Sequence, residues 1–265
     1  AKFEDSYKIS GDSFYQTDGK AVLPLGRLTI EETKAPVGLS VDPAVRTFVS
    51  DESGIYTDAN GVLFTNGGIR ITDEPVYGGV KILKRSLDQG EEPDGDARFE
   101  GAVFGIYNKN SYSVTRKDRE DDSYPTDAEV MRVTADAAGL AETAAVLQAG
   151  TYLVKELTAP EGYLLSEEEL LFTILEDKPG EIVDLTETPV RDQVIRGGFA
   201  LSKWDLELNE PGKFQGDATL EGAEFTLTNE SKHSVLVNGR KIAPGFPKPS
   251  ALVIFSGCMA AAIRP

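Results

Sequence analysis

Short segments in which apolar and polar residues alternate run along most of this chain. They include VKILK at 80–84, AVFGIYN at 102–108, GTYLVKE at 150–156 and LLFTIL at 170–175, all rich in β-branched and aromatic residues. A period of two residues places successive side chains on opposite faces, as in half-buried β-strands. Turn-forming clusters such as DQGEEPDGD at 88–96 separate these segments. The pattern predicts an all-β protein built from antiparallel β-sandwiches.

Two pairs of segments are near copies of each other. LGRLTIEETKAPVGL at 25–39 matches AGTYLVKELTAPEGY at 149–163, with an offset of 124 residues. GGVKILK at 78–84 matches GGFALSK at 197–203, with an offset of 119 residues. A repeat of this size predicts tandem domains, so each motif is interpreted by its place in the unit.

Overlaying the copies predicts the domain boundaries. We expect an N-terminally truncated unit over 1–77, a complete unit over 78–191, a C-terminally truncated unit over 192–245 and an atypical tail over 246–265. The joins between units are short, which favours a stiff array over a flexible string. The abrupt N-terminus predicts an internal piece of a longer protein.

Composition and charge narrow the range of partners. The 265 residues carry 27 basic and 44 acidic side chains, a net charge of −17, and 40% are hydrophobic, enough for buried cores. This charge argues against nucleic acid or an anionic membrane surface as a partner, because phosphates would be repelled. The single cysteine, Cys258, excludes an internal disulfide framework and a cysteine-based zinc site. No apolar run reaches 18 residues, so we expect no membrane insertion by this segment.

Charged residues fall on core-facing positions of three strands. Each is in phase with the apolar residues of its strand, and the last-strand pair comes from aligning TETPV on TDEPV. An unpaired charge in a core is costly, so a lysine, a glutamate and a further carboxyl group are expected to meet in each unit. These residues are Lys84 and Lys203 on the first strand, Glu32 and Glu156 on a middle strand, and Asp73 and Glu187 on the last strand.

The order of these motifs resembles a known family. A lysine ends the first strand of a unit, L-E-G-A-x-F comes next, then T-x-D-x-x-G, and G-T-Y-x-V-x-E-x-x-A-P-x-G-Y comes last. The second motif is found in the third unit, at 220–225, and the last two are found in the complete unit, at 134–139 and 150–163. Over roughly 15–240 the chain resembles the Cna B-type repeats of Gram-positive surface adhesins and pilins, which are prealbumin-like (Ig-like) sandwiches. The resemblance implies an intramolecular isopeptide bond between the lysine and a last-strand Asn or Asp, assisted by the glutamate.

The resemblance assigns a role to each residue of the complete unit. Lys84 would be the nucleophile, Glu156 the assisting acid, and Glu187, which is longer than the family's Asn or Asp, the acceptor. Glu32 and Asp73 would play the same roles in the first unit, whose lysine strand is expected upstream of Ala1. A buried amine and a buried acid are driven toward their neutral forms, which suits amide formation. The alternative is a buried ion pair without a covalent bond.

Other candidate sites are weaker. His233 is the only histidine, so Ser/His/Asp or Cys/His catalysis has little support. The acidic runs 88–96 and 118–122 lack the spacing of a calcium loop and are expected to be solvated. Trp204 follows the inward Lys203 and is expected to face outward. The sequence therefore predicts no enzyme, no cofactor and no metal site.

Three functional classes follow from these observations. The first is a structural stalk or pilin-like segment of an extracellular, cell-wall-anchored protein of a Gram-positive bacterium, with neighbouring domains of the same chain as partners. The second is a module of such a protein that binds host extracellular matrix or a glycan. The third is an accessory β-domain of a larger secreted enzyme. Repeated units with short joins favour the first class.

Overall fold

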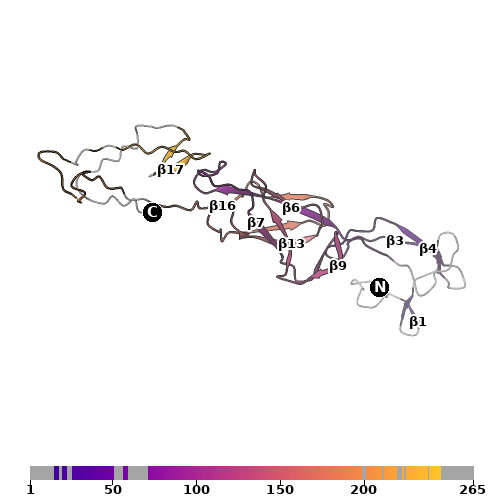
Figure 1. Cartoon of the computed structure of the whole chain (residues 1–265). Helices are drawn as coiled ribbons and strands as arrows, with labels where there is room; N and C mark the ends of the chain where they lie inside the picture. Colours follow the sequence, from indigo (N-terminus) through magenta and orange to yellow (C-terminus); the bar gives the residue numbers. More distant parts are fainter. Residues whose placement is uncertain are drawn as a thin grey trace. The chain divides into compact units, whose positions relative to one another are not determined.

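The computed structural model divides the chain into two compact units, Ala1–Val76 and Tyr77–Pro265 (Figure 1). It contains strands and turns but no helix among the described residues, which confirms the all-β prediction. No described helix is long and apolar enough to cross a membrane. The tandem arrangement of sandwiches stays a prediction. The described residues are 15–17, 20–22, 26–50, 56–58, 71–198, 201–210, 212–219, 223, 225–237 and 239–245.

The second compact unit contains a β-sandwich, which we call the middle sandwich. One of its sheets is wholly antiparallel. Its strands lie in the order β10-β7-β13-β14, with β13 at the centre paired to both β7 and β14. Tyr152 on β13 stacks on Phe172 of β14 with ring centroids 5.4 Å apart. The strands are β7 (Val103–Asn108), β10 (Glu129–Thr134), β13 (Gly150–Thr158) and β14 (Glu169–Ile174).

The second sheet is organised around the long strand β6 and is mixed. Its order is β11-β6-β12-β8-β9, and β15 and β16 also pair with β6. Both of these run parallel to β6, because the last strands return along β6 in its own direction, whereas the other described pairings of this sheet are antiparallel. The strands are β6 (Tyr77–Ser86), β8 (Val114–Arg116), β9 (Arg119–Tyr124), β11 (Leu140–Glu142), β12 (Leu147–Gln148), β15 (Ile182–Asp184) and β16 (Val190–Asp192).

Two glycines allow β6 to begin in a crowded place. A Cβ atom at Gly78 would lie 2.7 Å from the Glu181 carbonyl oxygen, and one at Gly79 would lie 2.7 Å from the Ala144 carbonyl oxygen. Side chains at these positions would push the neighbouring chain segments away. This explains why the first strand of the middle unit opens with Gly-Gly before its alternating pattern starts.

The remaining strands are short. In the first unit, β3, β4 and β5 form one antiparallel sheet and β1 pairs with β2; near the C-terminus, β17 and β18 form a hairpin. The predicted tail 246–265, with Cys258, lies outside the described residues. The bounds are β1 (Tyr15–Thr17), β2 (Lys20–Val22), β3 (Gly26–Ile30), β4 (Arg46–Ser50), β5 (Tyr56–Asp58), β17 (Val235–Val237) and β18 (Arg240–Ile242).

Candidate functional site

Three charged side chains meet inside the middle sandwich. Lys84 comes from β6, Glu156 from β13 and Asp192 from β16, and all three side chains are 0% exposed. Lys84 Nζ lies 2.9 Å from Glu156 Oε1 and contacts Asp192 Oδ1. An amine, an acid and a second carboxyl group are thus brought together away from water.

Strand register explains how these side chains reach one another. Lys84 is in phase with Val80 and Ile82 along β6, and all three are completely buried. The parallel partner of Lys84 on β16 is Val190, so Asp192, two residues further on, lies on the same face of that sheet. Glu156 approaches from the opposite sheet. The site therefore joins the neighbouring first and last strands of one sheet to β13 of the other sheet, across the core.

The surroundings raise the pKa of the Asp192 carboxyl group. Burial raises the pKa of Asp192 to about 7, and the Glu156 carboxylate adds to this effect while the Lys84 ammonium opposes it. Glu156 is oriented by its second oxygen, Oε2, which accepts a hydrogen bond of 3.0 Å from the Ser166 backbone N–H. Near neutral pH a large share of the Asp192 carboxyl groups is therefore protonated, the form in which a carboxyl carbon is most open to attack.

The expectation that Glu187 is the inward acceptor is wrong in its geometry. Glu187 is exposed and lies in the turn between β15 and β16, where the Thr188 N–H donates to the Leu185 carbonyl oxygen at 3.0 Å. The alternation of β15 ends at Asp184, so extending it by three residues gave the wrong face. The residue that reaches the lysine is Asp192, which the sequence interpretation missed.

Backbone pairing in the first unit shows which signal could have found Asp192. Leu39 bridges Pro75 in the first unit, and Tyr163 bridges Val194 in the middle unit. The second partners, Pro75 and Val194, are offset by 119 residues, the same offset as the two Gly-Gly segments. The alignment of TETPV on TDEPV uses an offset of 114 instead. At 119 the counterpart of Asp192 is the aspartate two residues before Pro75.

That aspartate, Asp73, lies beside Glu32 in the first unit. Burial raises the pKa of Asp73, and the neighbouring Glu32 carboxyl raises it further. Glu32 Oε2 accepts the Asp42 backbone N–H at 2.7 Å, ten residues on, as Glu156 accepts from Ser166. The first unit thus repeats the pairing of a glutamate with the aspartate found at this offset.

Lys203 does not occupy the inward position expected of it. The described residues around it, 201–205, form no strand, and Lys203 is exposed, with Nζ donating to the Trp204 carbonyl oxygen at 3.2 Å. Without a paired strand on this segment, alternation does not direct the lysine into a core. Trp204 is 40% exposed and its Nε1 donates to Ser202 Oγ at 2.9 Å.

The remaining candidates take structural positions. The acidic run 88–96 follows β6, and the His233 backbone N–H donates to the Gly95 carbonyl oxygen at 2.9 Å. Among the residues that the structure describes, no group of three His, Cys, Asp or Glu side chains is arranged to hold a metal ion.

Comparison with known proteins identifies the class of domain. Residues 89–189 match the family model described as the SpaA prealbumin-like fold domain. Within the middle unit, residues 89–189 are thus similar to the prealbumin-like fold domain that this model describes. A search of curated protein sequences gave no match.

Solved structures to which this chain is similar include surface and pilus proteins of other organisms. The Bacillus anthracis TIE protein is 25% identical, with 87% of this chain and 35% of that protein covered and a TM-score of 0.50. A streptococcal ancillary pilin is 20% identical over 65% of this chain and 43% of the pilin, with a TM-score of 0.31. The group B streptococcus pilus 2b backbone protein is 19% identical over 62% and 53%, with a TM-score of 0.33. The chain spans about a third of the length of the Bacillus anthracis protein.

Proposed function

We propose that this chain is a load-bearing stalk segment of a pilin-like or adhesin-type protein on the surface of a Gram-positive bacterium. Its middle domain is closed by an isopeptide bond between Lys84 and Asp192, formed with the help of Glu156. The observation that carries the proposal is the contact of Lys84 Nζ with the Asp192 carboxyl group. Lys84 Nζ also lies 2.9 Å from Glu156 Oε1, and all three side chains are fully buried. The SpaA-type fold supports the surface role.

The reaction balances without an added reagent. The neutral Lys84 amine attacks Cγ of the protonated Asp192 carboxyl group, and Glu156 accepts a proton from the attacking nitrogen. Glu156 then returns that proton to the departing hydroxyl group. One N–H bond and one C–OH bond break, one C–N amide bond forms, and water leaves. The step occurs once per molecule, so the protein turns over no external substrate.

The position of the bond suits a mechanical role. Lys84 lies near the end of the first strand of the sandwich and Asp192 at the end of its last strand. Tension entering along β6 would cross to β16 through the bond and bypass the residues between them. The bond also closes a loop of roughly 100 residues, which for a disulfide corresponds to about 4–5 kcal/mol of stabilisation. The domain would then resist both pulling and proteolysis.

Intact-mass measurement of the purified chain tests the bond. The expected mass is lower than calculated by one water molecule, and Lys84→Arg or Glu156→Gln restores the calculated mass. Asp192→Asn should lose ammonia instead of water, so its mature mass equals that of the parent protein. Glu187→Gln is the matched control and should still lose water. A parent mass equal to the calculated value would show that the three residues form an ion pair only.

A further inference from the structure

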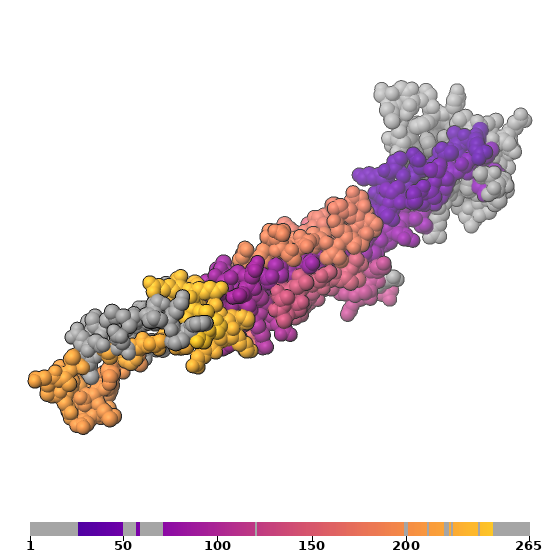
Figure 2. Space-filling view, turned by 90° about the horizontal axis from the view of Figure 1, so that it is seen from above, coloured from indigo at the N-terminus to yellow at the C-terminus, as the bar shows by residue number. Residues whose placement is uncertain are grey.

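The acidic segment after β6 holds the C-terminal hairpin. We call residues 86–96 the docking loop and residues 229–245, which contain β17 and β18, the tip hairpin. In Figure 2 the yellow tip hairpin lies against purple atoms of the middle domain. The Gly95 N–H donates to the Ser234 carbonyl oxygen at 3.0 Å, and the His233 N–H donates to the Gly95 carbonyl oxygen at 2.9 Å.

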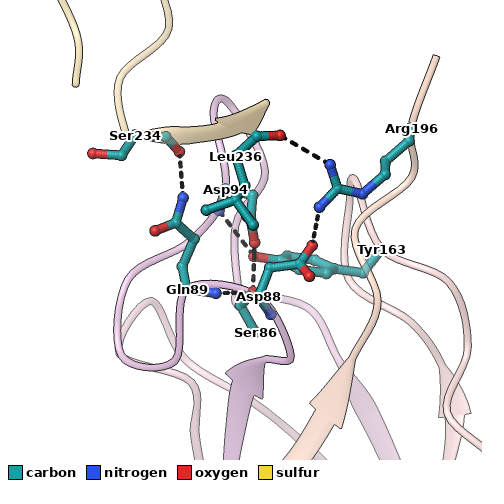
Figure 3. Close-up of polar contacts among 8 residues, drawn as sticks. All are labelled: Ser86, Asp88, Gln89, Asp94, Tyr163, Arg196, Ser234 and Leu236. Atoms are coloured by element: carbon teal, nitrogen blue, oxygen red, sulfur yellow. Dashed lines mark hydrogen bonds and ion pairs between the residues drawn. The ribbon is translucent and has the colours of Figure 1, made fainter. Parts of the chain in front are cut away.

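Side chains of the docking loop add to these backbone bonds. Gln89 Nε2 donates to the Ser234 carbonyl oxygen at 3.1 Å, as Figure 3 shows. The backbone N–H of Lys232 donates to Asp96 Oδ1 at 3.0 Å, and Lys241 Nζ lies 3.4 Å from Glu92 Oε2. Acidic residues that the sequence analysis expected to be solvated are therefore partners of the tip hairpin.

One arginine ties the two segments together. Arg196 lies between β16 and the C-terminal residues, and its guanidinium group has two partners (Figure 3). Nη1 donates to the Leu236 carbonyl oxygen in the tip hairpin at 3.0 Å, and Nη2 pairs with Asp88 Oδ2 in the docking loop. Its planar, forked donors can hold both partners at once, which a lysine ammonium group does less well.

The docking loop is itself fixed to the sandwich. Asp94 is buried at 5% exposure, and its Oδ2 accepts hydrogen bonds from Ser86 Oγ and from Tyr163 Oη at 3.1 Å (Figure 3). The Asp94 backbone N–H donates in turn to Tyr163 Oη at 3.0 Å. Fully buried hydrogen-bond networks of this kind restrict a loop to one conformation. The surface that meets the tip hairpin is thus preorganised.

The tip hairpin is the third repeat's copy of a hairpin in the middle domain. Asn229 Nδ2 donates to the His233 and Ile242 carbonyl oxygens, both at 2.9 Å. Asn108 Nδ2 makes the same pair of bonds, to Tyr112 and Tyr124, also at 2.9 Å. The docking loop of one repeat therefore holds the hairpin of the repeat that follows.

The residues before Gly78 and Gly197 make equivalent contacts. Tyr77 precedes Gly-Gly in the middle repeat, and its hydroxyl lies 3.4 Å from Thr115 Oγ1 on the hairpin of its own repeat. Arg196 precedes Gly-Gly in the third repeat and reaches Leu236, which occupies the place of Thr115 when the two asparagines are aligned. Arg196 differs from Tyr77 in having a second donor nitrogen, Nη2, which pairs with Asp88 of the preceding repeat.

From these contacts we infer that residues 86–96 are a docking surface for the tip hairpin of the following repeat, and that Arg196 specifies this joint by binding Asp88 and the Leu236 carbonyl group together. The inference goes beyond the proposed isopeptide bond and does not depend on it. A stalk needs joints that resist bending as well as domains that resist unfolding. This joint is built from hydrogen bonds to backbone groups and from one forked ion pair.

Amide hydrogen exchange of the full-length chain tests the joint. In the parent protein the Gly95 and His233 amides should be protected. Arg196→Tyr, which installs the residue type that precedes Gly78, and Asp88→Asn should each speed their exchange about tenfold, equivalent to about 1.4 kcal/mol. Combining the two changes should add little, because both break the same contact.

Two controls make the result decisive. The Thr143 amide, bonded to the Val80 carbonyl oxygen at 3.0 Å in the core, should keep its protection in every variant and so reports that the sandwich is intact. Arg191→Tyr changes an exposed arginine at β16 and should leave exchange at Gly95 unchanged. Unprotected Gly95 and His233 amides in the parent protein, or no acceleration in Arg196→Tyr, would overturn the inference.

Discussion

Lys84 and Asp192 lie two residues apart in the register of two neighbouring parallel strands, and Lys84 Nζ contacts Asp192 Oδ1. This relationship depends on the last strand of the sandwich running in the same direction as the first. An antiparallel last strand would carry the chain back toward the start of β6, so a bond at this point would not divert tension in the same way. The parallel return of β16 is thus the feature of the fold on which the proposed mechanical role of the site depends.

Replacing the lysine should weaken the middle domain strongly. Lys84→Met removes the bond and also leaves two buried carboxyl groups without a cation, so we expect the free energy of unfolding to fall by at least about 4 kcal/mol. Denaturant unfolding followed by circular dichroism measures this loss. Lys81→Met, on the outer face of the same strand, is the control and should change stability by less than about 1 kcal/mol. Similar stability for Lys84→Met and the parent would contradict both the bond and the buried ion pair.

Alternation along single strands was sufficient to find two members of this site. Lys84 is in phase with the apolar residues of β6, and Glu156 with Tyr152 and Val154 of β13, and these positions are buried. The all-β class followed from the same period of two. Within one strand, local pattern and burial agree because the pleat alternates the side chains without reference to the rest of the chain.

Two orientations could not be predicted in this way, since each depends on where a strand ends. Glu187 lies past the end of β15, in a turn, and Lys203 lies in a segment with no strand among its described residues. Asp192 is placed by its pairing with β6, a long-range contact that the local pattern does not contain. The offset of 119 residues between GGVKILK and GGFALSK was a sequence signal that pointed to it.

Two glycines at the same repeat position should respond differently to alanine. Gly78→Ala places a Cβ atom 2.7 Å from the Glu181 carbonyl oxygen, whereas nothing lies within 4 Å of a Cβ at Gly197. We therefore expect Gly78→Ala to cost about 1–3 kcal/mol and Gly197→Ala to be nearly neutral. Thermal unfolding of both variants measures the difference. Equal effects would show that the Gly-Gly motif serves backbone flexibility and not close packing.

Asn108 should be essential for the hairpin formed by β8 and β9. It is fully buried, and Asn108→Ala would leave the carbonyl oxygens of Tyr112 and Tyr124 without its amide donor. Losing these bonds should lower the free energy of unfolding by about 1–3 kcal/mol and speed proteolysis in the hairpin. Lys109→Ala removes only an exposed ion pair with Asp127 and should cost less than about 1 kcal/mol. Proteolysis of the hairpin at the parent rate in Asn108→Ala would argue against this role.

Tyr163 should make the middle domain sensitive to alkaline pH. Burial raises the pKa of Tyr163 to about 12 from an ordinary value of 10.0, because the folded domain disfavours the phenolate. The unfolded chain therefore loses its proton first, and the stability that Tyr163 provides is fully present below pH 10 and lost as pH rises through about 12.

Comparison with Tyr163→Phe isolates this effect from the titration of lysines. At neutral pH the variant should be less stable by about 1–2 kcal/mol, because Asp94 loses a hydrogen-bond donor in the buried network. Between pH 10 and about 12 the difference in unfolding free energy between the two proteins should narrow by up to about 2–3 kcal/mol and can reverse. The reason is that only the parent has an ionisable hydroxyl at position 163. Denaturant unfolding of both proteins over this range supplies the measurement. A gap that stays constant would mean that the Tyr163 hydroxyl ionises equally well in the folded and unfolded chains, and that it does not fix the docking loop.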